Sequence, residues 1–365
     1  MEKLITTNLN INQLSKTNKA RKRNNNIKND LKPFISKTCK YNFFSANEIN
    51  ISEKIKNIPY YCTYYLTLHD YDFIKVGQLG EKVVEELDSY DKLNDTMNYR
   101  EKYLLFQYKN IPFINFEDFL FGLNSPKQFI LHILTSFSDL LDSLIILNDN
   151  NICFFDLSTD NIIFTNENKL LLQSFQNSIY ISKLNESFIS KLITNICDFT
   201  NKPLEQHVLF YLTKNELYTL TDELILTITN KYVENLTVLN LFSLSYKDKF
   251  KKECIEILNK YKNKPKSDII CDIIEYNDTW DSYSISIIYL HIIGNIVRVF
   301  ELKGTFLSKL IIVLMKNIHP NPTKRENPKS IKHIYDSLFE EFQDWAFINK
   351  IPHEKLKKLL DTLKE

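Results

Sequence analysis

The sequence predicts an α+β protein in which a smaller, strand-rich part precedes a larger helical part. Segments 60–68, 72–79 and 103–106 are rich in aromatic and β-branched residues, as strands are. From Pro126 to Asn148, apolar residues recur at three- and four-residue spacing, which predicts a long amphipathic helix. Two short apolar runs then flank a polar turn between residues 162 and 172, which predicts a β-hairpin.

The N-terminal segment differs from the rest in composition. Residues 1–50 lack apolar periodicity, so we expect them to form a disordered basic tail. Within this tail, residues 1–40 hold ten Lys or Arg and two Asp or Glu, a local charge of +8 in a chain whose net charge is +1. Such a tail is typical of nucleic-acid contact, although a solvated arm without a specific partner has the same composition.

The remainder of the chain is expected to form two lobes. Residues 51–108 should form a small lobe of strands with one helix over 81–93. Residues 109–345 should form a helical large lobe, and Ser125 is a suitable N-cap for its first long helix. An amphipathic pattern within residues 346–365 predicts a C-terminal helix.

Cysteine usage and hydropathy indicate the compartment. The six cysteines show neither Cys-x-x-Cys pairing nor zinc spacing, which favours reduced thiols in an intracellular, cytoplasmic protein. The sequence begins without an apolar signal core. The most apolar long window, residues 285–300, is interrupted by polar residues, and we judge it too short to span a bilayer. We therefore expect no membrane contact.

The most informative stretch surrounds the predicted hairpin. Asp156 and Asn161 lie five residues apart before it, and Ser174-Phe175-Gln176 follows it. In protein kinases the catalytic loop H-R-D-L-x-x-x-N stands before a hairpin and the D-F-G motif. The segment therefore resembles the eukaryotic-type protein kinases, with Asp156 and Asn161 at the positions of the catalytic aspartate and the metal-binding asparagine.

Three later positions extend this resemblance into the large lobe. Lys202-Pro203-Leu204-Glu205 is similar to the A-P-E motif, Asp281 begins a segment similar to D-x-W-S, and Arg325 ends one similar to D-P-x-x-R. The family likeness implies a bilobal protein-kinase-like fold with a reduced small lobe. It also implies that Asp281 binds catalytic-loop backbone and that Glu205 pairs with Arg325 in the core. The segment at about 206–280 is much longer than its kinase counterpart, so we expect a helical insertion there.

Several working parts of a kinase are replaced. Ser158 stands at the position of the catalytic-loop lysine, and Ser174 stands at the position of the metal-binding aspartate. Phosphoryl transfer depends on cationic charge near the phosphates, and a neutral hydroxyl is a poor ligand for Mg²⁺. The resemblance therefore implies that most or all transfer activity is lost. Asp156 and Asn161 could then be retained for shape alone, through hydrogen bonds to loop backbone.

Nucleotide-binding positions are weakly marked. Lys75 is similar to the kinase strand lysine, with Glu85 or Glu86 as its helix partner, but an ordinary strand-edge lysine fits equally well. Phe106, Gln107 and Tyr108 match the hinge, whose backbone groups would face an adenine. The resemblance leaves ATP and Mg²⁺ open as ligands, with Asn161 as the remaining metal ligand.

Three functions follow from these patterns. The first is a pseudokinase that acts as a scaffold or regulator by presenting the large lobe or the 206–280 insertion to a protein partner. The second is a divergent, active Ser/Thr kinase in which Asp156 serves as base. The third is a nucleic-acid-associated protein that works through residues 1–40. The Asn-rich composition is similar to that of kinase-like proteins of large DNA viruses of amoebae, which implies a host-cell or virion location.

Overall fold

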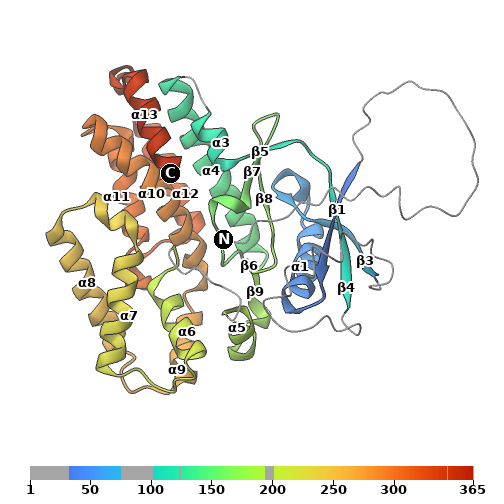
Figure 1. The fold of residues 1–365 in the computed structure, drawn as a ribbon. Coiled ribbons are helices and arrows are strands. Elements are labelled where there is room, and N and C mark those ends of the chain that lie inside the picture. The colour runs from blue at the N-terminus through green and yellow to red at the C-terminus, as the bar shows by residue number, and fades with distance from the viewer. Residues whose placement is uncertain (1–32, 75–101, 123–124, 194–200, 343, 365) are drawn as a thin grey trace, which may run out of the picture. The chain divides into compact units, whose positions relative to one another are not determined.

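The computed structural model describes residues 33–74, 102–122, 125–193, 201–342 and 344–364. The chain folds into two compact units. The first contains Met1–Pro112 together with the short segment Ser174–Gln176, and the second contains Phe113–Gln173 together with Asn177–Glu365 (Figure 1). Small sheets and many helices confirm the predicted α+β class.

An antiparallel sheet and one helix make up the first unit. The sheet has the order β1-β4-β3, formed by Phe34–Lys40, Tyr103–Lys109 and Leu68–Ile74. Helix α1 (Phe43–Lys56) begins at Asn42, whose side chain accepts hydrogen bonds from the backbone of Phe44 and Ser45. The core combines Leu68, Leu104 and Phe106 with Ile49 of α1. A 3₁₀ turn (Tyr61–Thr63) and the short strand β2 (Tyr65–Leu66) lie between α1 and β3.

The prediction of a basic tail up to residue 50 was wrong for residues 34–50. Strand β1 pairs with β4 along its whole length, from Phe34 opposite Lys109 to Lys40 opposite Tyr103. Helix α1 follows and buries Ile51 and Ile55 completely. Long-range pairing therefore orders a segment whose Lys- and Asn-rich composition suggested disorder. The rest of the tail lies outside the described residues.

Other small-lobe predictions had mixed outcomes. The strand expected over 60–68 is instead the 3₁₀ turn followed by β2, while the strand expected from residue 72 is described as part of β3 up to Ile74. The strand expected over 103–106 is β4, which continues to Lys109. Lys75, the helix expected over 81–93, and its candidate partners Glu85 and Glu86 lie outside the described residues.

The second unit contains the hairpin that the sequence predicts. Strands β7 (Ile162–Thr165) and β8 (Leu170–Gln173) pair antiparallel, and β5 (Phe113–Asn115) pairs with the other side of β7. Strand β6 (Ile152–Cys153) pairs with β9 (Ile179–Tyr180). Helix α4 runs over Pro126–Asp149, and the Ser125 hydroxyl accepts from the Gln128 N–H as the predicted N-cap.

Packed helices form the rest of this unit (Figure 1). Phe137 of α4 contacts Tyr289 and Tyr335 at ring-centroid distances of 4.9 and 5.3 Å, which joins α4 to α10 and α12. The phenol of Tyr289 donates to the hydroxyl of Ser136, so this buried polar group has a partner. The helices are α3 Phe116–Phe121, α5 Glu186–Ile193, α6 Leu204–Lys214, α7 Asp222–Asn235, α8 Leu244–Asn259, α9 Lys266–Ile274, α10 Trp280–Phe300, α11 Phe306–Asn317, α12 Pro328–Glu341 and α13 His353–Lys364.

Helices α6–α9 account for most of the 206–280 segment. They pack on α10 through a 3₁₀ turn at Thr237–Leu241, where Leu241 lies against Gly294. A Cβ atom at Gly294 would stand 2.6 Å from Cδ1 of Leu241, so a larger residue there would require the Leu241 side chain to shift. The C-terminal helix starts later than residue 346, because residues 346–350 form a 3₁₀ turn and α13 begins after Pro352.

Two of the described helices, Pro126–Asp149 and Asn277–Phe300, meet the length and hydropathy of a membrane span. The window 285–300 is therefore part of a longer apolar helix, and the expectation of no membrane contact stays a prediction. More than half of each apolar window is buried within the protein, as in the core helices of a folded domain. Length and hydropathy alone do not decide whether either helix meets a membrane.

Candidate functional site

The loop between β6 and β7 carries Asp156 and is held by Asp281 at the start of α10. The carboxylate of Asp281 accepts the N–H of Phe154 at 2.8 Å on Oδ2 and the N–H of Phe155 at 2.9 Å on Oδ1. Phe155 has a φ of 68°, a left-handed conformation that is rare for a large side chain. Its buried ring also packs edge-on against Trp280. The predicted contact between Asp281 and the loop backbone is thus present.

Asp281 should contribute measurably to stability. Burial raises its pKa, while the hydrogen bonds from Phe154 and Phe155 and the charge of Lys202 act in the opposite direction. We expect Asp281→Asn to lower the free energy of unfolding by about 2 kcal/mol, because one charge-assisted hydrogen bond becomes a clash between two N–H groups. Urea denaturation measures this loss. Asp361→Asn on the exposed face of α13 is the control, and an equal effect in both variants would contradict the assignment.

Both carboxylate oxygens of Asp156 have partners. Oδ1 forms an ion pair with the Nζ of Lys202, and Oδ2 accepts from the Nδ2 of Asn177 at 2.6 Å. The Lys202 side chain is only 5% exposed, so its ammonium group is held in contact with the Asp156 loop. Each oxygen of Asp156 therefore already has a described partner, while 30% of the side chain remains exposed. The sequence alone did not mark either residue as a partner of Asp156, although Lys202 begins the motif-like segment Lys202-Pro203-Leu204-Glu205.

Asn161 braces the loop in which it lies. Its Oδ1 accepts from both the N–H and the hydroxyl of Ser158, each at 2.9 Å, and its Nδ2 donates to the carbonyl of Gln173 at 3.4 Å. Ser158 and Asn161 thereby cap the 3₁₀ turn Thr159–Asn161. These contacts are those expected of a structural role.

The donor set does not fit Mg²⁺ well. Mg²⁺ prefers near-octahedral coordination by hard oxygens that include carboxylates. The amide oxygen of Asn161 already accepts two hydrogen bonds, and Ser174 offers a neutral hydroxyl in place of a carboxylate. Among the described residues, no group of three or more His, Cys, Asp or Glu side chains is placed to hold a metal ion.

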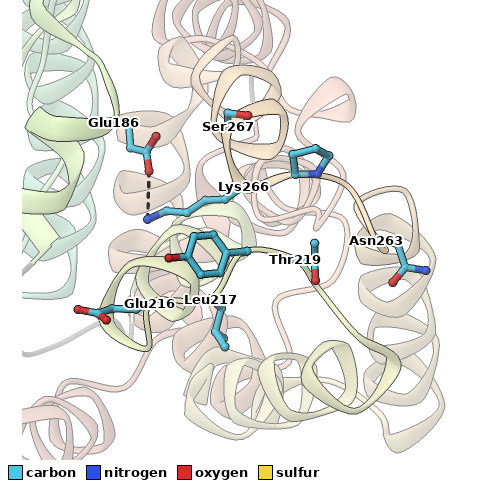
Figure 2. Close-up of a pocket in the computed structure, with 9 residues that line it drawn as sticks. Glu186, Glu216, Leu217, Thr219, Asn263, Lys266 and Ser267 are labelled. Carbon is cyan, nitrogen blue, oxygen red and sulfur yellow. Dashed lines mark ion pairs between the residues drawn. The ribbon is translucent and has the colours of Figure 1, made fainter.

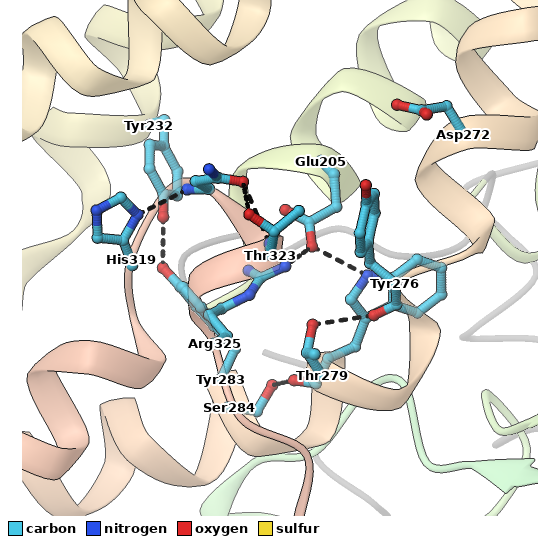
Figure 3. A network of polar contacts seen from close by, with 12 residues as sticks. Glu205, Tyr232, Asp272, Tyr276, Thr279, Tyr283, Ser284, His319, Thr323 and Arg325 are labelled. Carbon is cyan, nitrogen blue, oxygen red and sulfur yellow. Dashed lines mark hydrogen bonds and ion pairs between the residues drawn. The ribbon is translucent and has the colours of Figure 1, made fainter.

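A buried ion pair lies at the base of the second unit's polar core (Figure 3). Arg325 Nη2 contacts Glu205 Oε1, and the Trp280 indole donates to the same oxygen at 3.1 Å. The guanidinium also lies over the ring of Tyr283, whose hydroxyl is 2.7 Å from that of Tyr232. The predicted pairing of Glu205 with Arg325 is therefore present, although the two residues are far apart in sequence.

In the first unit, α1 holds the segment Ser174–Gln176. Asn47 Nδ2 donates to the Gln176 carbonyl at 2.9 Å, and the ring of the fully buried Phe175 meets Tyr65 edge-on. Glu48 is 3% exposed and accepts from the backbone of Phe175. Burial raises its pKa to about 7, while the charge of Lys37 on β1 acts against that rise.

Sequence reasoning missed Lys37 and Glu48 because both were assigned to the tail. The usable signal was the capping box of Asn42 and Ser45 at the start of α1, with Ile51 and Ile55 at four-residue spacing behind it. The assignment of Phe106, Gln107 and Tyr108 to a hinge was also wrong. All three lie within β4, where they pair with β1 on one side and β3 on the other, so the sheet uses their backbone groups.

A separate cavity of about 730 Å³ lies between the α6–α7 connection and the start of α9 (Figure 2). Lys266 and Glu186 form an ion pair of 3.1 Å at its wall, and the highly exposed Tyr218 is another of its lining residues. None of its lining residues belongs to the Asp156 loop. The cavity is therefore a surface feature formed by the 206–280 segment together with Glu186 of α5.

No protein-family model matches the sequence, and a search of curated proteins finds no significant relative. Functional inference therefore depends on the residues described above and on their contacts.

Proposed function

We propose that this chain is a protein-kinase-like scaffold or regulator that has lost most or all phosphoryl transfer. The observation that carries this proposal is the engagement of both Asp156 oxygens by Lys202 and Asn177. A catalytic base must have an oxygen within reach of the substrate hydroxyl. An aspartate that is bound on both sides, next to a neutral Ser158, is better suited to holding the loop together.

Structural features of both units support the kinase-like part of the proposal. In the second unit these are the Asp281 contacts to the loop backbone, the hairpin after Asn161, and the Glu205–Arg325 pair. In the first unit, Lys37 on a strand and Glu48 on the following helix match the lysine and glutamate that bind and position ATP in kinases. Lys37 is thus a better candidate for that lysine than Lys75.

A divergent, active Ser/Thr kinase is the second candidate. One observation favours it: Lys202 places a cation at Asp156, where the kinase loop lysine is replaced by Ser158. Release of Asp156 from Lys202 would then expose both a base and a phosphate-binding charge.

Radiolabelled ATP with Mg²⁺ and a generic basic protein substrate separates the two candidates. For the scaffold we expect no phosphate transfer that depends on Asp156, so that the wild type and Asp156→Ala give the same background. Lys202→Met should not raise this background transfer either. Transfer by the wild type that is lost in Asp156→Ala would overturn the scaffold proposal and establish an active kinase. Thermal unfolding with millimolar Mg·ATP shows separately whether nucleotide binds.

A further inference from the structure

Strand β3 is exposed to an unusual degree. Among the described residues it forms one edge of the sheet β1-β4-β3, and five consecutive residues from His69 to Phe73 are exposed. Alternate residues of an edge strand direct backbone N–H and C=O groups away from the sheet. Such an edge is a template for pairing with another extended chain. Two backbone groups of this stretch already have partners, since the His69 carbonyl accepts from Lys56 Nζ and the Tyr71 N–H donates to Asp70 Oδ1, each at 2.9 Å.

The side chains of β3 differ sharply between its two faces. Tyr71 lies in register with Phe106, and Phe73 with Leu104, so both rings share one face of the sheet. Phe73 is 58% exposed, and its ring contacts that of Tyr41, which is 45% exposed. On the opposite face, Asp70 and Asp72 are both exposed, and neither has an ion-pair partner among the described residues.

This pattern disfavours the pairing of β3 with the same strand of a second copy. An antiparallel, twofold pairing of β3 with itself, centred anywhere from Asp70 to Asp72, sets aspartate opposite aspartate. Like charges directly opposite each other destabilise a strand pair. Exposed carboxylates on an edge strand can protect it from pairing with other chains. The exposed aromatic residues beside them instead favour contact with a partner.

We infer that β3 is a docking edge for an extended segment of a partner protein that carries Lys or Arg at alternate positions, with apolar residues between them. The basic side chains of such a segment lie opposite Asp70 and Asp72. Its apolar side chains extend the aromatic face formed by Tyr71, Phe73 and Tyr41. Backbone hydrogen bonds along the edge supply affinity, and the alternating side chains supply selectivity. The inference holds whether or not Asp156 supports phosphoryl transfer.

Fluorescence anisotropy with labelled peptides tests this docking edge on the full chain. The probe alternates lysine and valine; a second peptide replaces each lysine by glutamate, and a third groups the lysines apart from the valines. We expect saturable binding of the alternating lysine peptide only. Asp70→Lys/Asp72→Lys should weaken that binding at least about tenfold and should create binding of the glutamate peptide.

Two further variants keep the result interpretable. Glu340→Lys/Glu341→Lys makes the same change in net charge on exposed residues at the end of α12 and should leave binding intact. Phe73→Ser should weaken binding without a change of charge. The inference is overturned if the alternating peptide does not bind, if the grouped peptide binds equally well, or if both charge reversals have the same effect. Circular dichroism confirms that each variant is folded.

Discussion

Arg325→Met should destabilise the second unit by about 3–5 kcal/mol, because it leaves the Glu205 carboxylate buried without its counter-charge. The Arg325 side chain is completely buried, and Glu205 is only 4% exposed. After the substitution, the Trp280 indole is the remaining described hydrogen-bond donor to Oε1 of Glu205. Urea denaturation of the wild type and the variant measures the loss.

The double variant Glu205→Leu/Arg325→Met distinguishes an ion pair from simple packing. Within the described structure, Glu205 Oε2 and the Nε and Nη1 atoms of Arg325 are buried without hydrogen-bond partners. Replacing both residues removes these unsatisfied groups together, so we expect the double variant to be more stable than Arg325→Met alone. If the loss of stability in the double variant equals the sum of the losses in Glu205→Leu and Arg325→Met, the two residues are not energetically coupled.

An exposed ion pair provides the matched control. Lys262 and Asp222 approach to 2.6 Å, but their side chains are 40% and 69% exposed. Solvent screens such a pair, so Lys262→Met should cost no more than about 1 kcal/mol. A similar loss in Lys262→Met and Arg325→Met would contradict the role given to burial.

The contacts that the sequence predicted are those fixed by spaced motifs. Asp281, Glu205 and Arg325 each stand in a short pattern, so the contact of Asp281 with the loop backbone and the pairing of Glu205 with Arg325 could be expected before any coordinates. The partners of Asp156 could not, because Lys202 and Asn177 reach it through the tertiary fold, and the motif-like segment that begins at Lys202 marked only Glu205 as a contact residue. Side-chain contacts of this kind depend on packing, which a single sequence does not display.

Errors in the first unit had a different cause. Composition dominated the interpretation of residues 34–50, although β1 is stabilised by pairing with the distant strand β4. Residues 106–108 were assigned to the hinge because the strand was expected to end at Phe106, whereas β4 continues to Lys109. Strand ends are set by partners in the sheet, so sequence patterns locate them poorly.

Glu48 should make the stability of the first unit fall as pH rises from about 4.5 to about 7. Burial raises its pKa from 4.5 to about 7, so the folded chain keeps a proton that the unfolded chain has already lost in this range. Stability from the protonated carboxyl is fully present below the unfolded pKa and is lost as pH rises through the folded one. The total change should be on the order of 3 kcal/mol, and the curve should be flat above pH 7.

Glu48→Gln isolates this effect, because a neutral amide of similar shape does not titrate. The free energy of unfolding of the wild type minus that of Glu48→Gln should fall between about pH 4.5 and 7, since other titrating groups cancel in the difference. Urea denaturation followed by circular dichroism measures it. Glu53→Gln on the exposed side of α1, where Glu53 pairs with Lys56 at 2.8 Å, is the control and should give a nearly flat difference. A flat difference for Glu48→Gln as well would mean that Glu48 is ionised throughout this range and that the Lys37 charge outweighs burial.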